Sequence, residues 1–275
     1  MNKYLNLGCG FHFSDKSEWT NIDFTSTHPK VIEHNLLNGI PAKDSVYEMV
    51  YHSHVLEHFS ESDGKKFIEE CYRVLKPGGV IRIVVPDLEQ IASNYLKYLN
   101  LAWDTKEEDE ILKLNYQWMM IEMYDQTVRN FSGGKMLSFL SQENLKNEEF
   151  VFGRIGEEGK VIRAEFLNRL KDQPKNKISL KRRVYIFIRP ILQFLRSFKN
   201  KQKEIGKFRF GGEIHQWMYD RYSLRLLLTE IGFENFQIVN AFHSYEMNWG
   251  NYHLDGINNI PRKPDSIYVE AVKPL

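Results

Sequence analysis

The sequence predicts an α/β protein with a doubly wound, mainly parallel β-sheet, and three observations carry this prediction. Short apolar segments that favour strands alternate with amphipathic segments over the first hundred residues. A glycine turn directly follows the first apolar segment. The segment "VIRIVVP" (80–86) is β-branched and almost continuously apolar, as expected of a central parallel strand covered on both faces. This order of elements is typical of doubly wound sheets.

Five strands and one helix are expected in this region. The helix is "DGKKFIEECYRVL" (63–75), whose apolar residues recur at helical spacing, and "KPGG" (76–79) is expected to end it. The strands are expected at 3–7, 19–22, 31–34, 47–53 and 79–85. Ligands of such sheets bind at the carboxyl ends of the strands. The candidate binding residues are therefore those that end a strand: Gly8–Gly10, Asp23, Asn35, Ser53–His58 and Pro86–Asp87.

Composition limits the class of protein. The 275 residues suffice for one large domain or one and a half, and 42% hydrophobic content suffices for a core. A net charge of +1 implies no general attraction to nucleic acid. Cys9 and Cys71 form no CxxC pair, which favours a reducing compartment. With no apolar leader and no stretch of about 18 apolar residues, we expect a cytoplasmic protein.

The glycine turn "LNLGCGFHF" could hold one of several nucleotides. A phosphate loop needs a lysine where Phe11 stands, and the NAD fingerprint needs a third glycine where Phe13 stands. A cofactor without phosphates needs only close backbone approach, which Gly8 and Gly10 permit because they lack Cβ. The carboxylate of Asp23, at the end of the second strand, can accept hydrogen bonds from both ribose hydroxyls. These features favour S-adenosylmethionine over NAD.

Several motifs in order resemble a class I S-adenosylmethionine-dependent methyltransferase of the broad type 11 group. They are "LNLGCG", "NIDF", "VYHSHVLEHF" and "ECYRVLKPGGVIRIVVPD", followed near the C-terminus by "YSLRLLLTEIGFENFQIVNAF" and "DSIYVEAVKP". The resemblance implies a seven-stranded Rossmann-like sheet whose last strand is antiparallel. The chain departs from the family pattern at Asn6, His12 and Asn35, where the family has an acidic residue, a third glycine and an acidic residue.

The resemblance also implies a set of cofactor-binding residues. They are Asn6, Gly8 and Gly10 for the methionine moiety, Asp23 for the ribose, Asn35 and Leu36 for the adenine, and Ser53 and His54 for the sulfonium side. For Asn6 and Asn35 the alternative is a loop residue that makes only turn hydrogen bonds.

The middle of the chain is expected to form a helical cap over the acceptor. Residues 87–212 exceed what a minimal methyltransferase needs, so residues 1–86 and 213–275 are assigned to the methyltransferase domain. Within the cap, Asp125 and Arg129 are spaced as an ordinary surface ion pair. The surrounding "YDQTVRNFSGG" is similar to sequences of this group found beside surface-polysaccharide genes. We therefore expect O-methylation of a sugar or polysaccharide precursor. The alternatives are a small-molecule or lipid methyltransferase and a non-catalytic adenosyl-binding scaffold.

A hydroxyl acceptor needs a group that takes its proton, whereas a phosphate or carboxylate acceptor does not. We predict that His58 and His215 are catalytic, with His243 as a weaker candidate and a structural role as the alternative for each. A metal site formed by His52, His54 and His58 is not expected, because a strand-to-helix spacing would scatter the three side chains.

The segment 175–203 combines positive charge with apolar residues. From 171 to 203, seven Lys and four Arg stand against Asp172 alone, a local charge of +10. A basic amphipathic stretch is typical of contact with an anionic membrane surface, here the inner face of the membrane. Packing on the sheet domain or in a homodimer is the alternative, and nucleic acid has no support beyond charge.

Overall fold

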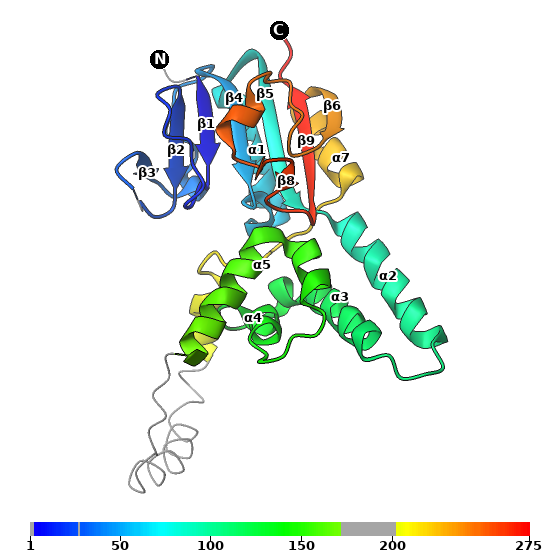
Figure 1. Ribbon diagram of the computed structural model, residues 1–275. Helices are drawn as coiled ribbons and strands as arrows, with labels where there is room; N and C mark the ends of the chain where they lie inside the picture. Colours follow the sequence, from blue (N-terminus) through cyan, green and yellow to red (C-terminus); the bar gives the residue numbers. More distant parts are fainter. Residues whose placement is uncertain (1–2, 27, 172–201) are drawn as a thin grey trace, which may run out of the picture.

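The computed structural model describes residues 3–26, 28–171 and 202–275, which form a sheet domain and a helical cap (Figure 1). The strands of the main sheet are β1 (Tyr4–Leu7), β2 (Trp19–Asp23), β3 (Val31–Glu33), β4 (Tyr47–Ser53), β5 (Leu75–Pro86), β6 (Glu234–Val239) and β9 (Ser266–Val272). Their order is β3-β2-β1-β4-β5-β9-β6. The first five pair in parallel, while β9 is antiparallel to β5 and β6. The expected fold class is therefore confirmed.

Helix α1 (Glu61–Val74) covers one face of the sheet. The hydroxyl of Ser60 accepts the N–H of Asp63 at its start, and the helix buries Phe67, Ile68, Cys71 and Val74 in the core. The helix ends at Val74, one residue before its expected end, but β5 begins at Leu75 instead of the expected residue 79. The N–H of Gly78 donates to the carbonyl of Lys273, and the carbonyl of Gly79 accepts the N–H of Lys273. These backbone pairs extend the strand through the glycines.

One charged residue interrupts the apolar run of β5 and anchors the C-terminal loop. Arg82 is fully buried and donates hydrogen bonds to the carboxylates of Asp255 (2.8 Å) and Glu270 (2.7 Å). It also donates to the carbonyl oxygens of Asn240 and His243. Because a buried charge must be paired and hydrogen-bonded, Arg82 holds this loop, with the short strands β7 (Gly256–Ile257) and β8 (Ile260–Pro261), against the sheet.

The cap lies at the carboxyl ends of the parallel strands (Figure 1). Its helices are α2 (Leu88–Asp104), α3 (Glu110–Val128), α4 (Gly134–Leu140) and α5 (Glu148–Lys171), followed by a short helix at 202–209. They share a hydrophobic core of their own, formed by Trp118, Met119, Phe139, Leu140, Leu145, Val151 and Ile155. After the cap, the chain returns to the sheet domain at α7 (Arg221–Ile231). The residues that end β1, β2, β4 and β5 thus face the cap.

Helix α5 bends where it meets the sheet domain. Gly156 has φ +68° and ψ −146°, and a Cβ there would lie 2.5 Å from the carbonyl oxygen of Arg262. Only glycine permits this approach together with this backbone conformation. The bend brings the second half of α5 over the ends of the strands.

The sequence had suggested a surface ion pair between Asp125 and Arg129, but the structure does not place this pair on the surface. Both side chains are buried, and the carboxylate of Asp125 accepts the N–H groups of Lys135 (2.7 Å) and Met136 (3.1 Å) at the start of α4. Arg129 also lies 3.2 Å from the carboxylate of Glu213. A carboxylate at a helix N-terminus satisfies free backbone donors, so Asp125 fixes the turn between α3 and α4.

Two predictions from the sequence are not tested by the structure. The basic segment 175–203 lies outside the described residues except at its last two positions. The division into residues 1–86 with 213–275 and 87–212 stays a prediction, although β5 ends at Pro86 and α2 begins at Leu88. Among the residues described, no helix is long and apolar enough to cross a membrane.

Candidate active site

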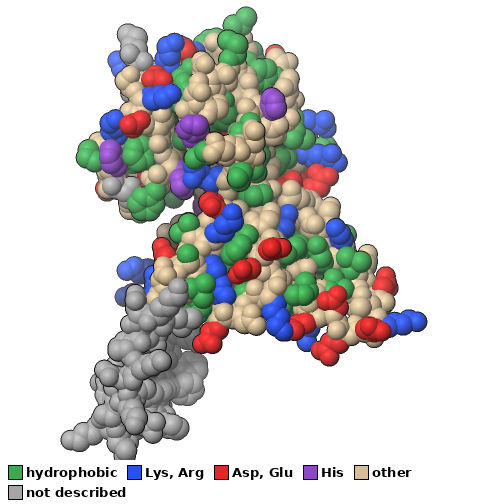
Figure 2. Space-filling view, viewed as in Figure 1, with side chains coloured by type: hydrophobic (Ala, Val, Ile, Leu, Met, Phe, Trp, Pro, Cys, Tyr) green, Lys and Arg blue, Asp and Glu red, His purple; other side chains and the backbone are tan. Residues whose placement is uncertain are grey.

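Three cavities meet where β4 ends, and the surface narrows between the two parts of the molecule there (Figure 2). The outer-strand cavity, about 620 Å³, is lined by Asp23, Asn35, Leu36 and His58 among others. The glycine-turn cavity, about 540 Å³, includes Asn6, Gly8, Gly10, His12 and Ser53. The cap cavity, about 530 Å³, lies between the cap and the end of β5. His54 lines all three, so a ligand atom near this side chain can be reached from each cavity.

The carboxylate of Asp23 ends β2 and is held by backbone donors. The N–H of Gly10 donates to one of its oxygens at 2.8 Å, and the N–H of Thr25 donates to the other at 3.1 Å. The side chain is half-buried and lines the outer-strand cavity. Each carboxylate oxygen can accept a second hydrogen bond, so the site is suited to a pair of hydroxyl groups.

The two glycines after β1 shape the floor of the neighbouring cavity. Gly8 has φ +63°, and a Cβ there would lie 2.3 Å from a methyl carbon of Val55. Gly10 has φ +52°, and a Cβ there would meet no atom within 4 Å. The first glycine is thus required by close packing, whereas the second leaves open space beside the chain.

The two asparagines that replace acidic residues of the family pattern both make local hydrogen bonds. Asn6 is buried, and its amide donates to the carbonyl oxygen of His12 at 3.2 Å. Asn35 accepts the N–H of Leu37 at 3.0 Å and so caps the short helix η1 (Leu36–Asn38). Both residues also line cavities, Asn6 the glycine-turn cavity and Asn35 the outer-strand cavity. Their turn bonds and the predicted contacts to a cofactor are compatible.

His54 occupies a strained position at the end of β4. Its φ is +55°, a left-handed conformation that is uncommon for residues other than glycine and is found at functional sites. Its Nε2 lies 2.9 Å from the hydroxyl oxygen of Ser266, and its Nδ1 lies 3.1 Å from a carboxylate oxygen of Glu57. The sequence placed His54 beside the sulfonium, but its shared position between all three cavities was not foreseen.

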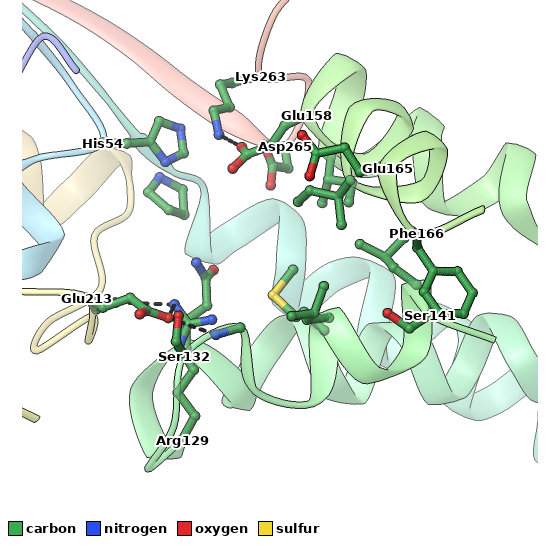
Figure 3. A pocket seen from close by; sticks show the side chains of 18 of the residues that line it. His54, Arg129, Ser132, Ser141, Glu158, Glu165, Phe166, Glu213, Lys263 and Asp265 are labelled. Carbon is green, nitrogen blue, oxygen red and sulfur yellow. Dashed lines mark hydrogen bonds and ion pairs between the residues drawn. The ribbon is translucent and has the colours of Figure 1, made fainter. Parts of the chain in front are cut away.

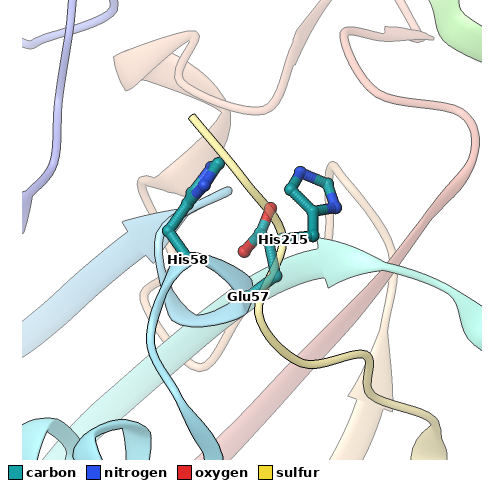
Figure 4. A group of neighbouring side chains, drawn as sticks. All are labelled: Glu57, His58 and His215. Atoms are coloured by element: carbon teal, nitrogen blue, oxygen red, sulfur yellow. The ribbon is translucent and has the colours of Figure 1, made fainter. Parts of the chain in front are cut away.

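Glu57, His58 and His215 form a compact cluster behind this junction (Figure 4). Glu57 is 0% exposed and His215 is 3% exposed. The rings of His58 and His215 meet edge to face, with centroids 4.8 Å apart. Burial lowers the pKa of His215 to about 3. Burial by itself raises the pKa of Glu57, but the nearby His54, followed by His58 and His215, lowers it to about 2.

The predicted general bases therefore lie in different surroundings. His58 is half-buried and lines the outer-strand cavity. Its Nδ1 forms a hydrogen bond with the carbonyl oxygen of Ile214 at 3.2 Å. His215 is not among the residues that line any of the three cavities. His243 is exposed on the loop after β6 and is likewise absent from these linings. The assignment of His58 and His215 as catalytic stays a prediction.

The cap cavity contains polar residues that the sequence did not single out (Figure 3). Carboxylates of Glu158, Glu165 and Asp265 and the ring of Phe166 line it. Glu158 of α5 forms an ion pair with Lys263, which precedes β9 in the sheet domain. Lys263 and Asp265 are about one hundred positions from the residues of α5, and no local motif marks either group, so only the docking of the cap brings them together.

Comparison with known proteins finds a methyltransferase domain in the N-terminal part of the chain. Residues 14–83, about a quarter of the chain, match a family model described as "Methyltransferase domain". A Mycolicibacterium smegmatis protein named "Probable S-adenosylmethionine-dependent methyltransferase" is 35% identical over 74 residues, which span 26% of this chain and 28% of that protein. The match thus covers less than a third of that relative's length.

Solved structures of two S-adenosylmethionine-dependent methyltransferases are similar over almost the whole chain. One, from Archaeoglobus fulgidus, is 12% identical, with a TM-score of 0.37, and the alignment covers 99% of this chain and 86% of that one. The other, from Aquifex aeolicus, is 10% identical, with a TM-score of 0.36 and coverage of 99% and 82%. At TM-scores this low, neither likeness bears on function.

Residues 14–83 thus match a methyltransferase domain, and the seven-stranded sheet with antiparallel β9 is the one that the resemblance to class I S-adenosylmethionine-dependent methyltransferases implied. The match agrees with the family and cofactor that the motifs predicted. The residues present fit the cofactor: a carboxylate ends β2, two glycines form the turn after β1, and the two cavities beside them fall within the usual range of roughly 300–1,000 Å³ for ligand sites.

Proposed function

We propose that the chain methylates an oxygen of a sugar or surface-polysaccharide precursor with S-adenosylmethionine as methyl donor. The observation that carries the proposal is the position of His54, where the two cavities suited to the cofactor open toward the cap cavity. When bound, the cofactor supplies a methyl group on a sulfonium, which an acceptor oxygen displaces in line. The protein's main task is then alignment of donor and acceptor.

Each cavity has a distinct part in this alignment. Asp23 binds the ribose hydroxyls, and Asn35 with Leu36 borders the adenine. Asn6, Gly8 and Gly10 hold the methionine moiety, while Ser53 and His54 face the sulfonium side. The acceptor enters the cap cavity, whose helices exclude water from the junction.

The lining of the cap cavity supports a hydroxyl-rich acceptor. The carboxylates of Glu158, Glu165 and Asp265 accept hydrogen bonds, and Arg129 donates them. The segment that resembles sequences found beside surface-polysaccharide genes contributes Gln126, Arg129, Ser132 and Gly133 to this wall. A sugar fits these groups better than an apolar lipid chain does.

Two measurements test the proposal. Isothermal titration should show binding of S-adenosylhomocysteine, and incubation with isotope-labelled S-adenosylmethionine and a cell-envelope extract should yield a labelled product whose mass identifies the acceptor. Binding of NAD without response to either adenosyl ligand would overturn the cofactor assignment. Cofactor binding without any methylated product would favour the non-catalytic scaffold, and a labelled lipid or small molecule would replace the sugar.

A further inference from the structure

A buried carboxylate without hydrogen-bond donors lies beside the junction of the cavities. Both side-chain oxygens of Glu57 are buried, and neither has a hydrogen-bond partner among the described residues, although Nδ1 of His54 lies 3.1 Å from one of them. Burial of an ionised carboxylate is costly unless donors or a cation compensate it. The structure therefore leaves a negative charge with unused acceptor capacity in the wall of the site.

Two imidazoles offer lone pairs at the same place. Nδ1 of His58 faces the carbonyl oxygen of Ile214 at 3.2 Å, so this nitrogen carries the proton and Nε2 is left as an acceptor. Nδ1 of His215 is buried and has no hydrogen-bond partner among the described residues. A neutral imidazole whose other N–H donates to a carbonyl is the usual form of a metal-binding histidine.

We propose that Glu57, His58 and His215 bind one divalent transition-metal ion. One donor atom from each residue lies within 4.8 Å of the others. Donor atoms of one tetrahedral ion at about 2.1 Å lie roughly 3.4 Å apart, so the widest pair must close by more than about 1 Å, which requires the side chains to rotate. Two imidazoles with one carboxylate suit Zn²⁺, Mn²⁺ or Fe²⁺, whereas Mg²⁺ and Ca²⁺ prefer oxygen ligands only.

This trio differs from the set His52, His54 and His58 that the spacing along the chain suggests for a metal, and it shares only His58 with that set. His52 points away from it, because its ring packs 5.1 Å from that of Phe67 in the core. Nδ1 of His54 lies 3.1 Å from a carboxylate oxygen of Glu57 and would orient this carboxylate, as an outer partner does for a metal ligand. The third ligand, His215, is 157 positions from His58, which is why spacing along the chain gives no sign of the site.

The ion would join a short helix of the sheet domain to the segment that returns from the cap. Glu57 and His58 belong to the short helix η2 (Leu56–His58) after β4, and His215 lies on the segment that returns from the cap. The N–H of His215 donates to the carbonyl oxygen of Gln126 in α3, and the N–H of Gln216 donates to the carbonyl oxygen of Glu57. Three protein ligands also leave a coordination position for water or an acceptor oxygen. The inference rests on the cluster and not on the proposed reaction.

Metal binding by the full chain tests this inference without any assay of methyl transfer. The chain, freed of any affinity tag and treated with a chelator, is titrated with Zn²⁺, Mn²⁺ and Mg²⁺ separately, and bound metal is counted by elemental analysis after gel filtration. We expect one Zn²⁺ or Mn²⁺ per chain, much weaker Mg²⁺ binding, and a higher Tm with bound ion. A Co²⁺ form should show visible absorption bands of a nitrogen- and oxygen-ligated ion.

Three variants locate the site. Glu57→Gln and His215→Gln should each weaken Zn²⁺ affinity by roughly 100-fold or more, since loss of an outer partner alone costs 10- to 100-fold. His58 is only half-buried, so His58→Gln tests the same site even if the other two variants fail to fold. His243→Gln makes the same change at an exposed histidine and should leave affinity unchanged.

Either of two results would overturn the inference. The first is that the folded wild type binds no stoichiometric Zn²⁺ or Mn²⁺. The second is that His58→Gln and the wild type bind Zn²⁺ with equal affinity. In either case the carboxylate of Glu57 is satisfied by buried water instead. Failure of S-adenosylhomocysteine binding would count against the proposed function and would leave the metal result untouched.

Discussion

The backbone N–H of Gly10 donates a 2.8 Å hydrogen bond to the carboxylate of Asp23, so the turn after β1 holds the end of β2 in place. This contact orients the carboxylate toward the outer-strand cavity, where the ribose is expected. It also ties the two strand ends that the sequence singled out into one binding surface.

The first prediction concerns this carboxylate. Asp23→Ala should weaken S-adenosylhomocysteine binding at least tenfold in isothermal titration, because a hydrogen bond to a charged group is worth about 1.5–3 kcal/mol. Asp15→Ala is the matched control, since Asp15 is exposed in the same loop region and pairs only with Lys30 at the surface. Equal affinities of the Asp23 variant and the wild type would show that the ribose binds elsewhere.

The second prediction contrasts the two glycines of the turn. Gly10→Ala meets open space and should cost only the left-handed backbone strain, about 1–2 kcal/mol in the free energy of unfolding. Gly8→Ala carries the same strain and also overlaps Val55, which adds about 1–3 kcal/mol. Denaturant unfolding should rank the variants in this order, and Val55→Ala combined with Gly8→Ala should recover part of the difference. An equal loss at both positions would contradict the packing explanation.

The third prediction concerns the ion pair between Glu158 of α5 and Lys263 of the sheet domain. Both residues line the cap cavity and the glycine-turn cavity, so the pair connects cap and sheet domain beside the expected methyl group. Glu158→Gln should lower kcat/KM for the acceptor by about tenfold and raise hydrogen exchange in α5, with cofactor affinity nearly unchanged. Glu149→Gln is the control, because Glu149 is exposed on the same helix and lines none of the three cavities. Unchanged exchange in α5 would mean that the pair does not hold the cap.

The fourth prediction rests on sequence alone, because the segment 175–203 lies almost wholly outside the described residues. Its local charge of +10 and its apolar residues should cause co-sedimentation with anionic vesicles and little with neutral ones. Replacing Lys181, Arg182 and Arg183 by Glu should reduce binding, as should high salt, because exposed charges are screened beyond ~8 Å at physiological ionic strength.

A charge-matched control separates this segment from the rest of the surface. Replacing Lys65, Lys66 and Lys76 by Glu makes the same change of charge on the sheet domain, where all three lysines pair with acidic residues. That variant should sediment like the wild type. Absence of vesicle binding at low salt would favour the alternative, in which the segment packs internally or in a homodimer.

Local sequence was sufficient to place most strands. Alternating apolar segments and turn residues act over a few positions, so the ends of β1, β2 and β4 were expected within one residue of their observed positions. Strand β5 begins earlier than the expected residue 79, because Gly78 and Gly79 pair with Lys273, almost two hundred positions away. No local pattern reports such a partner.

The sequence by itself determined the fold class, and it named a set of cofactor-binding residues that stays a prediction. Glycine conformation and strand-end carboxylates depend on neighbours in the chain, and five parallel strands bring their carboxyl ends to one edge by topology alone. Only the tertiary structure decided the rest. The buried surroundings of Asp125, the pair of Glu158 with Lys263, and the meeting of Glu57 and His58 with His215 all arise where the cap docks on the sheet domain. Burial and contact between distant segments set these properties, and the spacing of residues along the chain predicts neither.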